Sequence, residues 1–282
     1  MKKGLVLEGG AMRGMFTCGI IDVFLENGIA FDGLAGISAG AIFGCNYKSK
    51  QIGRGVRYNK RWGRDPRYFG LRSLIKTGDL YGYDFCYHKI IDELDPIDKK
   101  TYNENPMDFF IGACDIEEGV IRYYNSKKVD AETVEWIRAS ASMPLVSNIV
   151  EVDGYKLLDG GMIDPVPYSI MFKNGYDKNV IVLTQPRDFI KKKTFIIPFL
   201  KFKYRKYPKL VESMANRHIL YNKQLDEVRE LEKENKVYVI APKAPLNIKR
   251  TENNPDELER VYQIGRTEAM ENLEEIKTFL NV

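Results

Sequence analysis

The sequence predicts a mixed α/β fold, in which strands and helices alternate along one chain of 282 residues. Two segments carry this prediction, because in each an apolar strand-like run ends at glycines and a helix-like run follows. In the first, residues 2–8 precede a glycine cluster and residues 15–27 follow it. In the second, residues 31–35 precede Gly36 and residues 39–47 include Gly40. Further apolar runs predict additional strands at residues 109–114, 120–124, 180–183 and 237–240.

Length and composition indicate a single large domain over residues 1–282. The chain is near the upper size for one hydrophobic core, and no linker-like stretch divides it. Its hydrophobic and charged fractions, 44% and 29%, are ordinary for a globular protein. Two long charged segments, residues 209–234 and residues 254–279, predict a helical C-terminal part, and Asn254-Pro255 marks the start of the second helix.

The segment Gly36-Ile37-Ser38-Ala39-Gly40 places a serine on the turn between a predicted strand and a predicted helix. Glycines on both sides of a serine let the chain turn sharply and let the helix pack close to the strand. Ser38 would project from the end of the sheet as a nucleophile, and the amides after it would face developing negative charge. A glycine-rich turn that merely contains a serine would carry the same five residues.

The loop Gly9-Gly10-Ala11-Met12-Arg13-Gly14 lies between the first strand and the first helix, where free N–H groups can bind an anion or an oxyanion. Two nucleotide-binding motifs fit it poorly. A P-loop requires a Lys-Ser/Thr pair after the glycines, and none follows. A dinucleotide fingerprint requires glycine at its third position, which is Ala11 in this chain. It also requires an acidic residue at the end of the second strand, where Ser38 follows instead.

The segment Leu157-Leu158-Asp159-Gly160-Gly161 places an aspartate at the end of another strand, predicted over residues 155–158. A carboxylate at that position can accept the serine proton directly, as the general base of a two-residue catalytic site. Aspartate before glycine is also common in simple turns, so this segment alone leaves both interpretations open.

Together the three segments resemble the patatin-like phospholipases, whose pattern is a GGGxRG loop, a GxSxG elbow after the second strand and a downstream Asp-Gly-Gly or Asp-Gly-Ala. Residues 139–144 (ASASMP) also look like the segment that precedes the family's catalytic aspartate. The resemblance implies a three-layer α/β/α sandwich around a central, mainly parallel sheet. It further implies a Ser-Asp dyad of Ser38 and Asp159, and an oxyanion hole built from the amides of Gly10 to Arg13, with the amide of Ala39.

One position departs from the family pattern, which usually has a third glycine where this chain has Ala11. Alanine keeps the N–H group but is confined more than glycine to negative φ. A loop that needs positive φ there would distort the oxyanion hole. We expect the loop to tolerate alanine at this position, because alanine differs from glycine by only one methyl group. Two roles are open to Arg13, which either orients the loop or meets a substrate phosphate.

A Ser-His-Asp triad is the main alternative mechanism, and the chain has only two histidines. Ser38, Asp159 and His218 follow the nucleophile, acid, histidine order of α/β-hydrolases. Ser38 nevertheless follows only the second predicted strand, and His218 lies within a long predicted helix, which favours a surface or packing role. His88 lies among aromatic residues and is expected to be structural.

Residues 187–209 form a basic and aromatic insertion, with Lys191-Lys192-Lys193, an apolar run over residues 195–200 and further cations up to Lys209. Such a segment predicts peripheral membrane contact through Lys191 to Lys209, because each basic residue gains ~1 kcal/mol near anionic lipid. A basic loop with one core-packing run is the alternative. The cations of residues 54–67 either extend this surface or form a solvated helix face. No nucleic acid partner is expected, since the net charge is only +4 and no binding motif accompanies it.

The remaining features of the sequence indicate the cellular compartment and the need for cofactors. The four cysteines lie far apart and make neither metal-like nor disulfide-like pairs, and the apolar run before Glu8 is too short for a signal peptide. We therefore expect a cytoplasmic protein, peripheral at the membrane, without a metal or organic cofactor; its oligomeric state is not indicated. The predicted function is hydrolysis of carboxylic ester bonds in lipids through an acyl-enzyme. The alternatives are a non-phospholipid carboxylesterase and a membrane-surface binding protein with little turnover.

Overall fold

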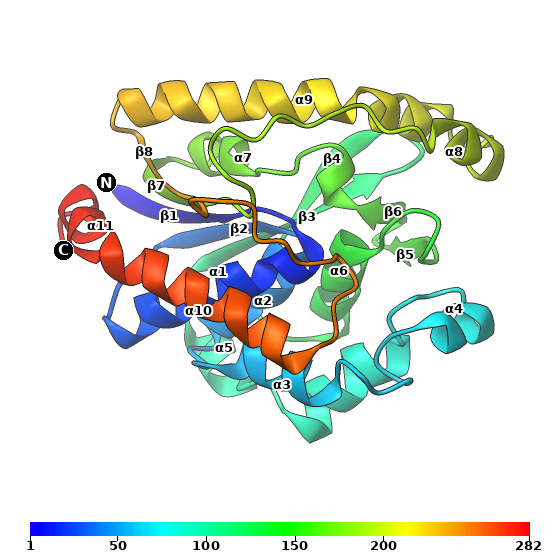
Figure 1. The fold of residues 1–282 in the computed structure, drawn as a ribbon, viewed down its shortest axis with the longest axis horizontal. Coiled ribbons are helices and arrows are strands. Elements are labelled where there is room, and N and C mark those ends of the chain that lie inside the picture. Colours follow the sequence, from blue (N-terminus) through cyan, green and yellow to red (C-terminus); the bar gives the residue numbers. More distant parts are fainter.

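The structure is a computed structural model that describes residues 1–282, the whole chain, and it contains one eight-stranded sheet between two layers of helices (Figure 1). The strands are β1 (Lys2–Leu7), β2 (Gly33–Ile37), β3 (Asp108–Asp115), β4 (Val120–Asn125), β5 (Val150–Val152), β6 (Tyr155–Asp159), β7 (Tyr176–Val182) and β8 (Val237–Ile240). Their order is β5-β6-β3-β2-β1-β7-β8, and β4 pairs with β3 off this path. The pairs among β3, β2, β1, β7 and β8 are parallel, whereas β4, β5 and β6 add antiparallel pairs. The predicted α/β/α sandwich with a mainly parallel sheet is confirmed.

Helices cover both faces of this sheet. They are α1 (Gly14–Glu26), α2 (Ala39–Lys48), α3 (Arg54–Trp62), α4 (Leu71–Thr77), α5 (Lys99–Glu104), α6 (Ala131–Ala141), α7 (Tyr168–Lys173), α8 (Ile197–Lys203), α9 (Pro208–Lys233), α10 (Pro255–Glu271) and α11 (Leu273–Leu280). Two short 3₁₀ turns, Ala11–Arg13 and Gly160–Met162, and a π-helical segment, Phe85–Leu94, complete the elements. None of the helices is both long and apolar enough to cross a membrane.

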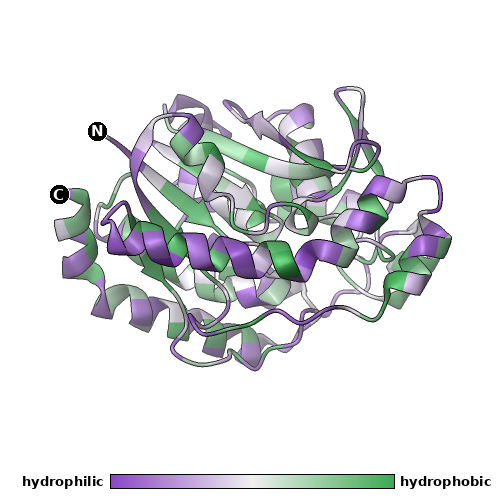
Figure 2. Ribbon diagram, turned by 90° about the horizontal axis from the view of Figure 1, so that it is seen from above, coloured by the Kyte–Doolittle hydropathy of each residue, from purple (hydrophilic) through white to green (hydrophobic).

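Alternation along the strands sends side chains into two separate cores. Leu5 and Leu7 of β1 belong to the core beneath α1, α2 and α10, whereas Val6 between them faces the core beneath α7 and α9. α9 runs along the top of the molecule in Figure 1. Figure 2, which looks down on α9, shows that hydrophilic residues dominate its length. This helix therefore covers the sheet with one face and meets solvent with the other.

The C-terminal helices pack tightly on the N-terminal one. A Cβ at Gly265 of α10 would lie 2.0 Å from the carbonyl oxygen of Phe16 in α1, so only glycine permits this crossing. The single helix predicted over residues 254–279 is wrong in one respect, because Asn272 divides it into α10 and α11. The Tyr238 hydroxyl of β8 donates a hydrogen bond to Asn272 Oδ1 at 2.7 Å, and this contact with the sheet fixes the break.

Candidate active site

The predicted nucleophile elbow is present between β2 and α2. Ser38 has φ 55° and ψ −119°, a backbone conformation that is strained for any residue other than glycine. A Cβ at Gly36 would lie 2.7 Å from the backbone of Gly40, and one at Gly40 would lie 2.3 Å from the carbonyl oxygen of Leu7. Both flanking glycines are therefore required by the close approach of α2 to the sheet.

Ser140, near the end of α6, holds this elbow in place. Its buried Oγ accepts a hydrogen bond from the backbone N–H of Ser38 at 2.8 Å and donates one to the carbonyl oxygen of Gly112 in β3 at 2.6 Å. The hydroxyl thereby ties the strained turn to a central strand. The sequence placed Ser140 within the segment 139–144 but indicated no role for it, because its partners are 102 and 28 residues away.

Asp159 ends β6, and its side chain caps the turn that follows. Oδ1 accepts a hydrogen bond from the backbone N–H of Gly161 at 2.7 Å. Burial raises the pKa of the Asp159 carboxyl, while the Gly161 amide, the charge of Arg217 and a hydrogen bond with Ser38 act in the opposite direction. Ser38 and Asp159 line the same cavity, so the fold brings together the two residues that the sequence paired.

The glycine-rich loop lies against the elbow. A Cβ at Gly9 would lie 3.1 Å from Cβ of Ser38, and the backbone amides of Gly10 and Ala11 donate to no other group of the fold. Ala11 has φ 49°, so the loop does adopt positive φ at the position where alanine replaces glycine. Nε of Arg13 donates to the Thr184 hydroxyl at 3.4 Å, which ties the loop to the residues after β7.

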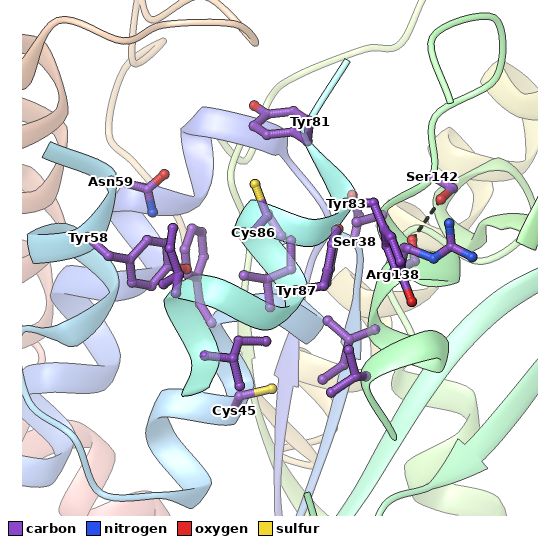
Figure 3. A pocket seen from close by; sticks show the side chains of 18 of the residues that line it. Ser38, Cys45, Tyr58, Asn59, Tyr81, Tyr83, Cys86, Tyr87, Arg138 and Ser142 are labelled. Atoms are coloured by element: carbon purple, nitrogen blue, oxygen red, sulfur yellow. Dashed lines mark hydrogen bonds between the residues drawn. The ribbon is translucent and has the colours of Figure 1, made fainter. Parts of the chain in front are cut away.

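Two cavities meet at Ser38. The first, the apolar pocket, encloses about 130 Å³, and 20 of its 28 lining residues are hydrophobic. In Figure 3, Ser38 and Tyr83 are drawn toward one side of this pocket and Tyr58 toward the other, and Tyr87 is drawn between them. The second, which we call the cationic cavity, encloses about 460 Å³, and its wall carries Arg13, Lys191, Lys192, Arg217, His218 and Arg250. Ala11, Ser38 and Met143 belong to the walls of both.

The two histidines have different surroundings. His88 lies in the π-helical segment with its ring 4.9 Å from the ring of Tyr83, in an edge-on arrangement, which fits the structural role expected of it. His218 lies on α9 as predicted, but it lines the cationic cavity instead of lying on the surface or in the core. His218 forms no hydrogen bond with Asp159, whose Oδ1 accepts from the Gly161 amide.

Among the cations of residues 54–67, Arg54 has neither of the two predicted roles. Arg54 of α3 is buried and donates to the carbonyl oxygen of Asp95 and to Asn46, and Arg57 pairs with Asp95 at 2.8 Å. The prediction of a solvated or membrane-facing cation at Arg54 is therefore wrong, because a distant backbone carbonyl accepts its hydrogen bonds. The insertion at residues 187–209 has three parts with different surroundings. Lys191 faces the cationic cavity, Leu200 and Tyr204 are buried in the core, and Phe195, Phe199 and Phe202 are exposed.

Comparison with known proteins places this site in a family. Residues 5–172 match the model of the patatin-like phospholipases. The chain belongs to this family. Residues 207–281, which include α9, α10 and α11, match a second model that is described as a domain of unknown function.

The relatives of this patatin-like chain are longer proteins. An uncharacterized Escherichia coli protein, YjjU, is 28% identical over 191 residues, which cover 64% of this chain and 52% of that protein. The lysophospholipase NTE1 of Meyerozyma guilliermondii is 29% identical over 187 residues, covering 61% of this chain and 12% of the yeast protein. This chain thus spans about half of the first relative and a small part of the second. Among solved structures, VipD from Legionella pneumophila superposes with a TM-score of 0.47 and 12% identity, covering 97% of this chain and 67% of VipD.

Proposed function

We propose that this patatin-like chain is a lipid acyl hydrolase that cleaves carboxylic ester bonds through Ser38 and Asp159. The observation that carries the proposal is the position of Ser38, beside Asp159 and at the junction of the apolar pocket and the cationic cavity. A lipid ester has the same division, since its carbonyl lies between an acyl chain and a polar headgroup. The name of the Meyerozyma guilliermondii relative, lysophospholipase, agrees with this class of substrate.

The chemistry follows from the groups at this junction. Ser38 Oγ attacks the ester carbonyl carbon while the Asp159 carboxylate takes its proton. The free amides of Gly10 and Ala11 stabilise the tetrahedral oxyanion, a contribution of about 3 kcal/mol for each well-placed donor. The intermediate collapses, the alcohol leaves with the proton from Asp159, and Ser38 retains the acyl group. Water then attacks the acyl-enzyme, Asp159 accepts the water proton and returns it to Ser38, and the fatty acid is released.

We further propose that the protein meets its substrate at a lipid surface through α8 and the residues before it. Phe195, Phe199 and Phe202 are 92%, 73% and 78% exposed. Lys201 and Lys203 flank them on the same helix and are available to anionic headgroups. α4, with exposed Leu71 and Ile75, lies at the same end of the molecule as α8 in Figure 1.

The test of the catalytic proposal is fatty-acid release from lysophospholipid and from mixed anionic and zwitterionic vesicles. We expect Ser38→Ala and Asp159→Asn each to reduce kcat by at least about a thousandfold, because each removes a participant in bond making. Ser38→Ala should also abolish labelling by a fluorophosphonate, and His218→Ala should keep it. Loss of labelling and hydrolysis in folded His218→Ala would replace the dyad with a triad. No labelling of the wild type would contradict the hydrolase assignment.

A further inference from the structure

The cationic cavity holds more positive charge than a Ser-Asp hydrolase requires. Arg13, Lys191, Arg217 and Arg250 all line it, and the charge of Arg250 lowers the pKa of each of the other three side chains. None of the four forms an ion pair with a carboxylate, although nearby Arg187 pairs with Glu232 and Lys209 pairs with Glu118. Arg187 and Lys209 therefore have acidic partners, whereas the four cations of the cavity wall have none.

The two carboxylates of the cavity are already engaged by other groups. Glu8 accepts hydrogen bonds from the backbone N–H and the hydroxyl of Thr184, at 2.5 and 3.0 Å, and from the Tyr221 hydroxyl at 2.7 Å. Asp159 is held by the Gly161 amide. Neither carboxylate forms an ion pair with a cation of the cavity wall. The cavity therefore carries a net positive charge that an anion of the right size would balance.

Keeping these cations together costs free energy in the absence of an anion. Burial, together with the charges of Arg217, Arg250 and Arg13, lowers the pKa of Lys191 to about 7, and only Glu8 raises it. Burial likewise lowers the pKa of the Arg13 and Arg217 side chains. Clusters of partly buried like charges of this kind are typical of binding sites, because the ligand supplies the missing counter-charge.

The cations come from three parts of the chain. Arg13 belongs to the glycine-rich loop, and Lys191 belongs to the segment after β7. Arg217 lies on α9 and Arg250 on the loop after β8, both within the residues that match the domain of unknown function. Arg217 also touches the catalytic turn directly, since its Nε donates to the carbonyl oxygen of Gly161 at 2.5 Å. Residues 207–281 thus form part of the wall of the cationic cavity, whereas the apolar pocket is lined only by residues of the patatin-like region, 5–172.

We propose that the cationic cavity is a phosphate subsite for the headgroup of the substrate, to which the C-terminal region contributes Arg217 and Arg250. The inference rests on the proposed acyl hydrolase activity. A phosphate in the cavity, an acyl chain in the apolar pocket and the ester carbonyl at Ser38 would occupy both spaces at once. Guanidinium groups suit a phosphate because they donate paired hydrogen bonds. The positive cavity disfavours choline and favours acyl glycerophosphates without a cationic headgroup.

The test compares two dispersed substrates that share one acyl chain, 1-oleoylglycerol 3-phosphate and neutral 1-oleoylglycerol. We expect the wild type to prefer the phosphate ester in kcat/KM. Arg250→Gln and Arg217→Gln should each lower the ratio of the two kcat/KM values by about tenfold or more, as for a lost charge-assisted hydrogen bond. Arg250 is exposed, so its variant is expected to fold even if buried Arg217→Gln does not. The matched control, Lys223→Gln on the outer face of α9, removes one charge and should leave the ratio unchanged.

A binding measurement separates the subsite from the activity. Calorimetry with Ser38→Ala should show binding of glycerol 3-phosphate, and this binding should weaken by about tenfold when Arg250→Gln is added. A ratio near one in the wild type, or an equal loss on both esters in the Arg250 variant, would overturn the subsite. If inorganic phosphate binds as tightly as glycerol 3-phosphate and does not compete with 1-oleoylglycerol 3-phosphate, the cavity is a site for free phosphate, and the headgroup assignment is overturned. Binding of glycerol 3-phosphate without hydrolysis of either ester would instead refute the proposed activity and leave the anion site standing.

Discussion

Removal of the Ser140 hydroxyl should weaken the fold and the catalytic elbow together. Ser140 is fully buried, and its single Oγ serves both the Ser38 amide and the Gly112 carbonyl. In Ser140→Ala, the buried Ser38 N–H has no acceptor, which costs about 1–3 kcal/mol, and the bond to Gly112 is lost at about 1 kcal/mol. We therefore expect the free energy of unfolding to fall by about 2–4 kcal/mol.

The effect on catalysis follows from the strain at the elbow. Ser38 is held at φ 55° and ψ −119°, a sparsely populated conformation that costs about 1–3 kcal/mol, and the hydrogen bond to Ser140 opposes its relaxation. A shift of the nucleophile by about 1 Å is enough to lower a rate by about a hundredfold. We expect kcat for ester hydrolysis by folded Ser140→Ala to fall by at least about tenfold.

The assay is urea denaturation at neutral pH, together with kcat measured well below the unfolding transition. Ser73→Ala is the matched control, because Ser73 is buried, its hydroxyl donates one hydrogen bond, to the carbonyl oxygen of Asp79 at 2.7 Å, and it lines neither of the two cavities. This control should lose only about 1 kcal/mol and keep its kcat. A Ser140→Ala protein that loses less than about 1 kcal/mol and retains full kcat would refute the reasoning.

Three further outcomes are expected. Ala11→Gly should raise the free energy of unfolding by up to about 1 kcal/mol, since alanine at φ 49° is strained by about 1–2 kcal/mol and glycine returns part of this as unfolded-state entropy; lower stability in urea denaturation would contradict the strain. Because burial raises the pKa of Asp159 and the base must be ionised, kcat/KM should fall as the pH falls through that raised pKa. Arg217→Gln should move this acid limb to higher pH, and an unmoved limb would show that Arg217 does not act on the carboxyl. Phe199→Ser should weaken binding to anionic vesicles, measured by sedimentation, by about tenfold, whereas Met270→Ser, which also removes an exposed apolar side chain but on α10, should not. Equal binding by the two variants would exclude α8 as the membrane contact.

Much of the fold was predictable because its evidence is local. An apolar run that ends at glycines and continues as a helix defines β1 with α1 and β2 with α2, whatever the rest of the chain does. The boundaries were less secure: β2 begins at Gly33 instead of residue 31, since its first pairing is with Gly4 of β1. The periodicity of apolar residues does not indicate which strands pair or where the pairing begins. It likewise does not indicate the contact with Tyr238 that accompanies the break between α10 and α11 at Asn272.

The chemistry divides in the same way. The sequence placed the serine on a strand-to-helix turn, and its resemblance to the patatin-like phospholipases paired that serine with the distant aspartate, because short segments with glycines at set spacings carry the resemblance. It showed nothing of the Ser140 anchor or of the cationic cavity, whose side chains come from the glycine-rich loop, residues 187–196, α9 and the loop after β8. Each of those cations resembles a surface residue in its own stretch of chain. Only the folding of α9 and of the loop after β8 brings them together beside Ser38, where burial and mutual repulsion lower the pKa of Lys191 and create the cluster of unpaired cations that we propose as the phosphate subsite.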